Sequence, residues 1–378
     1  MMKRAIINGK IITSSEILED KVLIFDEKII AIKDSVDNSD IEIIDAKGNY
    51  VSAGFIDIHI HGSGGADTMD STFEALNTIS TTILQSGTTS FLATTMTMSK
   101  KRIYEALESI KEYKDTLDGA NLLGVHMEGP FINPAKSGAQ DSKYIISGDI
   151  EMIDRYQEII YMITLAPEID DNLSFIKTIS QNYPHITLSI GHSSANYQES
   201  KESFDAGISH STHLFNAMPP YHHRDVGIIG AVFDDDRVSC DIIADGIHTH
   251  PSTIDLTYRL KRDNLILITD SMRAGCMRDG IYDLGGQKVK VKEQKATLSN
   301  GTLAGSVLSL NMAIRNLLNY TKCSLVEAIS TVTTIPAKKL DINKGSLKVG
   351  FDADIVIFDK DIDVKTTIIN GRIKYIKI

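Results

Sequence analysis

The stretch Gly54-Phe-Ile-Asp-Ile-His-Ile-His-Gly-Ser-Gly-Gly65 decides how the rest of the chain is interpreted. Its apolar residues predict a short buried strand that runs directly into a glycine-rich turn. His59 and His61 occupy alternate positions, so both imidazoles point the same way from an extended strand. The glycines that follow let the backbone approach whatever those imidazoles hold. One such pair is a modest sign of a metal site, and the rest of the chain must supply partners for it.

Composition limits the class of protein. The 378 residues carry 39 Lys+Arg against 50 Asp+Glu, a formal charge of −11, without a dense basic run. This balance argues against nucleic acid as a partner. The three cysteines are scattered and form no CxxC, which predicts a reducing compartment rather than a disulfide framework. The N-terminus has no apolar signal core, and no apolar run approaches the ~20 residues of a membrane helix. We therefore expect a cytoplasmic protein without a membrane partner.

The two ends of the chain share one pattern. Residues 1–52 and 344–378 alternate short apolar runs with turns such as Asn8-Gly9 and Asn370-Gly371, which is typical of β-strands. Neither piece is large enough to bury a good core alone. We expect them to pair into one small β-sandwich domain.

Residues 53–343 alternate strand-like and helical segments, which predicts an α/β fold. Helices are expected at Ser99–Asp115 and Ser252–Lys261, among others, and a β-hairpin insertion at 280–305. Eight strands alternating with helices favour a (β/α)8 TIM-like barrel, with an open doubly wound sheet as the alternative. The expected strands lie at 55–60, 88–93, 121–127, 160–165, 186–190, 207–212, 238–243 and 264–269.

Residues able to bind a metal or move protons end five of these eight strands, where barrel enzymes place their active sites. Glu128, His192 and His213 offer one carboxylate and two imidazoles, which suit Zn²⁺ or a similar metal with a position left open for water. His59 and His61 are candidates for a second ion, so one or two divalent ions (Zn, Fe or similar) are expected per subunit.

Each of these residues also has a structural interpretation. Glu128 can satisfy loop amides, Asp270 can cap a following helix, and a strand-end histidine is often a core or capping residue. Five His/Glu residues and one Asp ending five strands are better explained by a site. His126 shares a face with Glu128 only if that strand stays regular, so its role is left open. The remaining histidines considered are interpreted as structural or exposed: His185, His210 and His250.

Several pieces of the sequence carry a family resemblance that covers nearly the whole chain. They are Gly54–Gly62, Gly65–Asp70, His126-Met-Glu-Gly-Pro-Phe131, Thr164-Leu-Ala-Pro-Glu168, Gly191-His-Ser193, Thr212-His-Leu-Phe-Asn-Ala-Met218, Ala244–His248, Thr269-Asp270, Leu303–Ser306 and Gly345–Val356. By these pieces the chain resembles the amidohydrolase superfamily, and within it the N-acetylglucosamine-6-phosphate deacetylase family. The resemblance implies metal-dependent hydrolysis of the acetamide of N-acetylglucosamine 6-phosphate to glucosamine 6-phosphate and acetate, in amino-sugar catabolism.

The resemblance also implies roles for individual residues. Glu128, His192 and His213 correspond to family metal ligands, and the retained His59 and His61 make a second ion possible. Asp270 corresponds to the acid/base that takes a proton from a metal-bound water and passes it to the departing nitrogen. The resemblance further implies a homodimer or homotetramer. Sugar-phosphate contacts are implied at Ala139, Gln140, Asn216, Ala217, Arg224, His248, Leu303, Ala304 and Gly305.

Because the chain is acidic overall, hydrogen-bond donors for a phosphate must be grouped in one segment. Tyr221-His-His-Arg-Asp225 is the best candidate segment, since Arg224 can hold a phosphate bidentately. The alternatives are that this segment is a solvated loop or that it reaches the site of a neighbouring subunit.

Two rival functions remain open. One is another superfamily activity, a cyclic-amide hydrolase of the dihydroorotase kind or a deaminase; the lack of a strand-end lysine disfavours the cyclic-amide enzymes. The other is a non-catalytic sugar-phosphate sensor, which would have no need of a proton shuttle such as Asp270.

Overall fold

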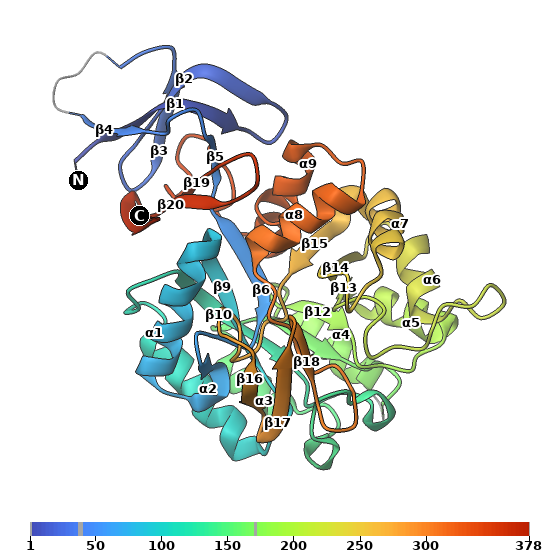
Figure 1. Ribbon diagram of the computed structural model, residues 1–378. Helices are drawn as coiled ribbons and strands as arrows, with labels where there is room; N and C mark the ends of the chain where they lie inside the picture. The colour runs from blue at the N-terminus through green and yellow to red at the C-terminus, as the bar shows by residue number, and fades with distance from the viewer. Residues whose placement is uncertain (1, 37–40, 170–171, 378) are drawn as a thin grey trace.

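The computed structural model describes residues 2–36, 41–169 and 172–377. Most of the chain forms a barrel of parallel strands covered by helices, and the two ends of the chain form a separate sheet beside it (Figure 1). The prediction of a (β/α)8 barrel with a β-domain built from both termini is confirmed. The exact division at residues 52/53 and 343/344 stays a prediction.

The barrel strands follow one another around the ring in chain order. The first and last meet where the Asp270 N–H donates to the His59 carbonyl and the His61 N–H donates to the Ser271 carbonyl, both at 2.9 Å. This sequential order excludes the open doubly wound sheet, in which the strand order reverses. The strands are β6 (Phe55–Ile60), β9 (Thr88–Thr95), β10 (Asn121–Glu128), β11 (Ile160–Leu165), β12 (Thr187–Ile190), β13 (Ile208–Ser211), β14 (Ser239–Ile243) and β15 (Leu265–Ile268).

The strands are apolar because the barrel interior covers one face and helices cover the other. Phe55, Ile56 and Ile58 of β6 are completely buried, as expected for parallel strands that bury both faces. Gly54 leads into β6 so close to β9 that a Cβ there would lie 2.0 Å from the Thr89 hydroxyl oxygen. Only glycine allows this approach, which places the strand that carries His59.

Helices surround the barrel, and their caps and apolar faces follow the sequence pattern. The Ser99 hydroxyl accepts the Arg102 N–H at the start of α2, which buries Ile103, Leu107 and Ile110 on one face. The expected helices at 99–115 and 252–261 correspond to α2 and α7. The helices are α1 (Phe73–Thr82), α2 (Lys100–Tyr113), α3 (Ile150–Tyr156), α4 (Asn172–Asn182), α5 (Tyr197–Ala206), α6 (Gly227–Asp234), α7 (Pro251–Lys261), α8 (Leu310–Tyr320), α9 (Leu325–Ser330) and α10 (Thr334–Lys339).

The terminal sheet interleaves strands from both ends of the chain. β19 of the C-terminal segment pairs antiparallel with β5 of the N-terminal segment, and they share a core that includes Val51 and Ile355. Asp354 joins this sheet to the barrel by accepting Lys344 Nζ at 2.7 Å and Asn121 Nδ2 at 3.2 Å. The strands are β1 (Arg4–Ile12), β2 (Ile17–Phe25), β3 (Ile29–Lys33), β4 (Glu42–Asp45), β5 (Tyr50–Ala53), β19 (Ile355–Phe358), β20 (Val364–Ile369) and β21 (Arg372–Ile376).

The insertion after β15 is a three-stranded antiparallel sheet rather than the two-stranded hairpin expected at 280–305. Gly285-Gly286 and Glu293-Gln294 all have positive φ, as hairpin turns with two left-handed residues require. The second turn therefore adds a further strand. The strands are β16 (Gly280–Leu284), β17 (Gln287–Lys292) and β18 (Lys295–Thr297), and a short pair, β7 (Gly62–Ser63) and β8 (Ala66–Asp67), follows β6.

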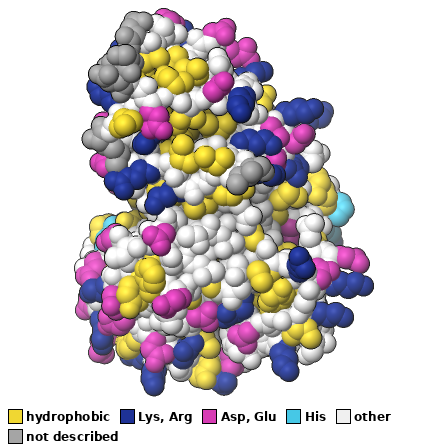
Figure 2. All heavy atoms as spheres, turned by 60° about the vertical axis from the view of Figure 1, so that its left-hand side comes forward, with side chains coloured by type: hydrophobic (Ala, Val, Ile, Leu, Met, Phe, Trp, Pro, Cys, Tyr) yellow, Lys and Arg dark blue, Asp and Glu magenta, His cyan; other side chains and the backbone are white. Residues whose placement is uncertain are grey.

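The surface shows no block of one charge on the face in Figure 2, where Lys/Arg and Asp/Glu side chains are interspersed. None of the helices in the described part of the chain has the length and apolar character needed to cross a membrane.

Candidate metal-dependent active site

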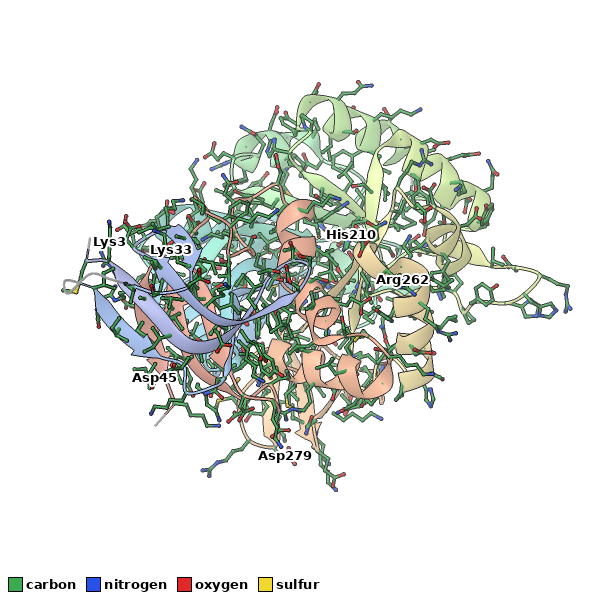
Figure 3. All side chains as sticks on the ribbon, turned by 90° about the horizontal axis from the view of Figure 1, so that it is seen from above. Lys3, Lys33, Asp45, His210, Arg262 and Asp279 are labelled. Atoms are coloured by element: carbon green, nitrogen blue, oxygen red, sulfur yellow. The ribbon has the colours of Figure 1, made fainter. Side chains whose placement is uncertain are left out.

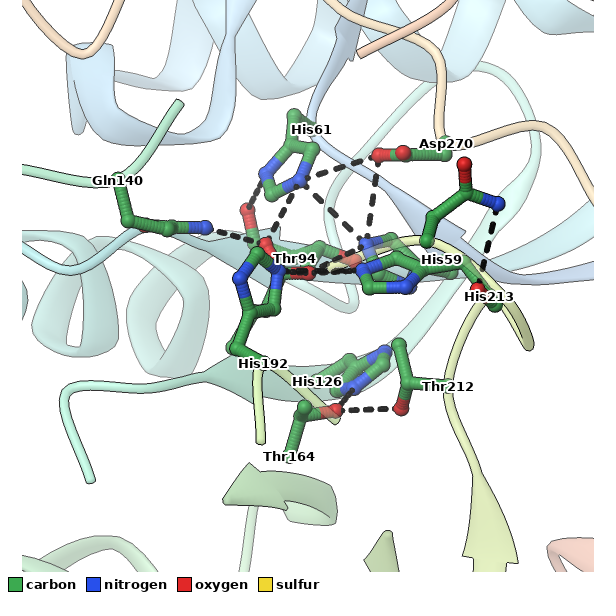
Figure 4. A network of polar contacts seen from close by, with 12 residues as sticks. His59, His61, Thr94, His126, Gln140, Thr164, His192, Thr212, His213 and Asp270 are labelled. Atoms are coloured by element: carbon green, nitrogen blue, oxygen red, sulfur yellow. Dashed lines mark hydrogen bonds and ion pairs between the residues drawn. The ribbon is translucent and has the colours of Figure 1, made fainter. Parts of the chain in front are cut away.

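Six polar side chains converge at the carboxyl ends of the barrel strands (Figure 4). His59 lies in β6, His61 directly follows it, and Glu128 ends β10. The other three follow β12, β13 and β15, and all six residues are at most 8% exposed. The spacing in the sequence placed these residues at strand ends, and closure of the barrel brings them together: His59, His61, Glu128, His192, His213 and Asp270.

Glu128 lies at the centre of the cluster. Its Oε1 lies 2.9 Å from His213 Nε2, 3.1 Å from His192 Nε2 and 3.5 Å from His59 Nε2. Its Oε2 lies 3.2 Å from His61 Nε2. Glu128 therefore belongs to two groups of three ligands, one with His59 and His61 and one with His192 and His213. In each group the ligand atoms lie within 4.8 Å of one another.

Two of the imidazoles are oriented by backbone carbonyls. His61 Nδ1 donates to the Thr94 carbonyl at 3.2 Å, and His192 Nδ1 donates to the Lys136 carbonyl at 2.8 Å. A carbonyl can only accept, so Nδ1 carries the proton and Nε2 is the atom free to bind a metal. Imidazole nitrogens around a shared carboxylate are the donor set that divalent transition ions prefer. These residues fit a divalent metal.

Electrostatics lead to the same conclusion. Burial raises the pKa of Asp270, but His59 and a hydrogen bond with His61 outweigh burial and hold its pKa at about 2. Burial also opposes ionisation of Glu128, but neighbouring imidazoles hold its pKa well below the usual range. Burial lowers the pKa of His61, yet its hydrogen bonds with Asp270 and Glu128 raise it well above the ordinary value. Two ionised carboxylates in a buried site need compensating positive charge, which a divalent ion would supply in place of protons.

Backbone conformation separates this cluster from ordinary strand ends. His192, His213 and Asp270 have φ of 47°, 30° and 48°, a left-handed region that residues other than glycine rarely adopt. Such conformations persist only where the surrounding structure enforces them, and they are concentrated at functional sites. Asp270 begins no helix, so it is not the helix cap considered from the sequence.

Residues that hold the ligands in place were not identified from the sequence. Glu168 accepts the Asn133 amide at 2.8 Å and the Ser194 N–H at 2.5 Å on one oxygen, and the Ser193 hydroxyl at 2.7 Å on the other. These bonds hold the loop that follows His192. Glu168 lies within a motif shared with the family, but its partners lie on two other loops, one after β10 and one after β12. Only the folded chain shows them.

A cavity of about 350 Å³ opens over the cluster. Seven of the nine residues with predicted sugar-phosphate contacts line it, whereas Ala304 is completely buried nearby and Arg224 does not line it. The sequence did not point to several further lining residues, among them Met96, Lys136 and Leu284, because they come from loops and from the inserted sheet. The seven residues are Ala139, Gln140, Asn216, Ala217, His248, Leu303 and Gly305.

Both ends of the Gln140 amide are engaged within the protein. Its Nε2 donates to Glu128 Oε2 at 2.5 Å, and its Oε1 accepts the Thr97 N–H at 2.6 Å. His248 is similarly held, with Nδ1 2.7 Å from Asp245 Oδ2. These contacts orient both side chains at the cavity wall.

Arg224 lies in the loop between β13 and α6, which extends away from the barrel wall (Figures 1 and 3). Its guanidinium approaches His223 Nε2 at 2.7 Å, and backbone hydrogen bonds between His222 and Asp225 close the loop. Within one chain Arg224 does not reach the cavity. Its predicted contact with a phosphate stays a prediction.

The other histidines have structural partners. His126 is completely buried, and both ring nitrogens are hydrogen-bonded below the cluster. His210 lies inside the barrel (Figure 3), with Nε2 2.8 Å from Asp241, whose other oxygen accepts the His213 N–H. His185 contacts the Gln157 carbonyl, and His250 caps α7.

Comparisons with known proteins agree with this geometry. The model of the amidohydrolase family matches residues 50–374. The chain belongs to the amidohydrolase family. An N-acetylglucosamine-6-phosphate deacetylase from Bacillus subtilis (strain 168) is 44% identical over 334 residues, covering 85% of this chain and 84% of that protein. The predicted membership of the deacetylase family within the amidohydrolases is confirmed, and with it the prediction that the protein is an enzyme.

Solved structures of amidohydrolases extend this similarity to the whole fold. The N-acetylglucosamine-6-phosphate deacetylase from Pasteurella multocida has a TM-score of 0.94 at 32% identity and covers 99% of this chain and 100% of its own. A variant of the deacetylase from Mycobacterium smegmatis, in complex with N-acetyl-D-glucosamine-6-phosphate, has a TM-score of 0.92 at 25% identity and covers 99% and 100%.

Proposed function

We propose that the protein hydrolyses the acetamide of N-acetylglucosamine 6-phosphate to glucosamine 6-phosphate and acetate, in amino-sugar catabolism. The observation that carries this proposal is the buried cluster of Glu128 and four imidazoles, with Asp270 beside it, under a cavity of about 350 Å³. Family relatives named for this reaction support the same substrate.

Glu128, His192 and His213 would hold one divalent ion, and His59 and His61 with Glu128 would hold a second. When bound, such an ion polarises the amide carbonyl and lowers the pKa of a coordinated water towards about 7. The chain's contribution is to present Nε2 of each imidazole and to keep both carboxylates ionised.

Asp270 is the proposed general base and acid. It lines the cavity, and its Oδ1 lies 3.4 Å from His61 Nε2 and 3.5 Å from His59 Nε2, beside the second group of ligands. Because its pKa is held at about 2, the carboxylate is free to accept a proton from the attacking water at neutral pH. As the carbon–oxygen bond forms and the carbon–nitrogen bond breaks, that proton passes to the amine nitrogen.

The nine residues with predicted sugar-phosphate contacts are proposed to bind the substrate. Gln140 is proposed to act chiefly through its hydrogen bond to Glu128. Since Arg224 points away from its own cavity, we assign it to the phosphate in the site of a neighbouring subunit, in a homodimer or homotetramer. The cytoplasmic location stays a prediction; Cys240, Cys276 and Cys323 are all free thiols.

The decisive experiment is acetate release from N-acetylglucosamine 6-phosphate, run beside the unphosphorylated sugar, with metal content measured on the same sample. Release that needs both the phosphate and a bound metal is expected. A folded, metal-loaded sample that releases no acetate would contradict the proposal and would direct attention to cyclic amides and deaminase substrates.

A further inference from the structure

A chain of hydrogen bonds crosses the barrel directly beneath the candidate metal ligands (Figure 4). His126 Nδ1 lies 2.9 Å from the Ile58 carbonyl, and His126 Nε2 lies 2.7 Å from the Thr164 hydroxyl. The Thr164 hydroxyl lies 2.7 Å from that of Thr212, which lies 2.6 Å from that of Ser189. The chain thus joins β6, β10, β11 and β12 with the residue after β13.

The direction of every bond in this chain follows from its first member. Because the Ile58 carbonyl can only accept, His126 Nδ1 carries the proton and Nε2 must accept. Thr164 therefore donates to His126, Thr212 donates to Thr164, and Ser189 donates to Thr212. With both nitrogens engaged, His126 has no lone pair for a metal. This answers the question that the sequence left open.

The candidate ligands differ in how their second nitrogen is held. His61 and His192 donate from Nδ1 to backbone carbonyls, the usual way in which a metal-binding imidazole is oriented. His59 Nδ1 and His213 Nδ1 have no hydrogen-bond partner among the described residues. Instead, the His59 ring packs edge-on against the His126 ring, with centroids 4.6 Å apart and an interplanar angle of 73°.

We propose that His126 is a positioning residue for His59. The His126 ring is fixed by its hydrogen bonds with Thr164 and the Ile58 carbonyl. By packing against the His59 imidazole, it fixes the orientation that a hydrogen bond from His59 Nδ1 would otherwise set. Close packing leaves these hydrogen-bonded side chains little freedom to rearrange. A Cβ at Gly191 would lie 2.6 Å from Thr164 Cγ2 and 3.1 Å from Thr212 Cβ, so the backbone before His192 packs directly on these two threonines.

This role rests on the proposed function, in which His59 binds a metal. It is tested on the full-length protein, stripped with a chelator, by calorimetric titration with Zn²⁺. Thr164→Val removes the donor to His126 and keeps the shape of the side chain, so it should weaken Zn²⁺ binding by about 10–100-fold. Thr164→Ser, which keeps the hydroxyl, should bind as the wild type does. Thr89→Val is the matched control, because Thr89 is a buried barrel threonine that takes no part in this series of hydrogen bonds.

A double-mutant cycle separates positioning from a general loss of structure. In a His59→Ala background there is no ring left to hold, so Thr164→Val should cause no further loss of Zn²⁺ affinity. An unchanged affinity for Thr164→Val, or an equal loss for Thr89→Val, would overturn the proposal while leaving the metal site intact. A wild-type protein that binds no Zn²⁺ would overturn the proposed function as well.

A second measurement needs no variant. Imidazole ¹⁵N shifts of the metal-free wild type should show His126 with its proton on Nδ1 and with Nε2 unprotonated. The opposite tautomer would contradict the direction of the chain and with it the locking of the ring.

Discussion

Replacing Glu168 by alanine is expected to loosen the loop that carries His192. The carboxylate accepts three hydrogen bonds, from Asn133, Ser193 and Ser194, and so joins the segment after β10 to the segment after β12. His192 itself has φ of 47°, a conformation that its surroundings must enforce. Removing the acceptor leaves three donors without their partner.

The size of the effect follows from these bonds. A hydrogen bond to a charged group contributes about 1.5–3 kcal/mol, but Glu168 is partly exposed and water can replace some of the lost contacts, so we expect about 2–4 kcal/mol in total. At about 2.1 cal/mol/K per residue, unfolding 378 residues gains on the order of 0.8 kcal/mol/K, so Tm should fall by about 3–5 °C. Glu168→Gln should cost about 1 kcal/mol or less, because its oxygen still accepts from Asn133 and Ser194 and its NH₂ can donate to Ser193.

The assay is thermal unfolding of the metal-free protein together with calorimetric titration with Zn²⁺. Glu168→Ala should lower both Tm and Zn²⁺ affinity, the latter by about tenfold, because it releases the loop that holds His192. Glu202→Ala is the control, since among the described residues this exposed carboxylate accepts a hydrogen bond from Gln198 alone. The reasoning is refuted if Glu168→Ala shifts Tm by no more than Glu202→Ala and binds Zn²⁺ as the wild type does.

Four further predictions follow from the site and from one partly buried lysine. Asp270→Asn should keep its fold and bound metal but lose about 10²–10⁴-fold in kcat; normal turnover would remove Asp270 from the mechanism. Arg224→Ala should raise KM for the phosphorylated sugar by about 10–100-fold and leave the unphosphorylated sugar unaffected, whereas an equal loss on both would count against a phosphate contact. Chelation should abolish acetate release and lower Tm, and Zn²⁺ at 1,000 times its Kd should raise the unfolding free energy again by about 4 kcal/mol. A chelated sample with full activity would exclude a metal from the reaction. Burial lowers the pKa of Lys339 to about 8, so between pH 8 and 10.5 the unfolded chain binds more protons than the folded chain. The unfolding free energy of the wild type relative to Lys339→Met should therefore rise across that range by as much as about 3 kcal/mol, and the same difference between the two proteins at pH 8 and at pH 10 would contradict this.

Much of the barrel could be predicted from local pattern alone. The apolar runs are short, β-branched and separated by amphipathic segments, so each strand and most helices are specified by residues near them in the chain. Polar residues directly after such runs must lie at one end of a parallel barrel. For this reason the sequence alone is enough to predict that His59, Glu128, His192, His213 and Asp270 meet.

Contacts between distant loops could not be predicted in this way. Glu168 looks like any loop carboxylate until folding brings Asn133 and Ser194 to it. The third strand of the insertion depends on a turn at Glu293-Gln294, which carries no glycine to mark its positive φ. Arg224 has a phosphate-binding side chain, but the direction of its loop decides which cavity it can serve.

The sequence by itself determined the order of strands and helices, the face of β6 on which His59 and His61 lie, and the residue types that can bind a metal. These depend on periodicity and on chemistry that each residue carries with it. Only the tertiary structure decided which imidazoles keep a free nitrogen. His126 and His59 have the same side chain, and they differ because one meets a carbonyl and a hydroxyl from other strands while the other faces Glu128. Hydrogen-bond partners come from strands far apart in the chain, so the state of each ring is set by closure of the barrel.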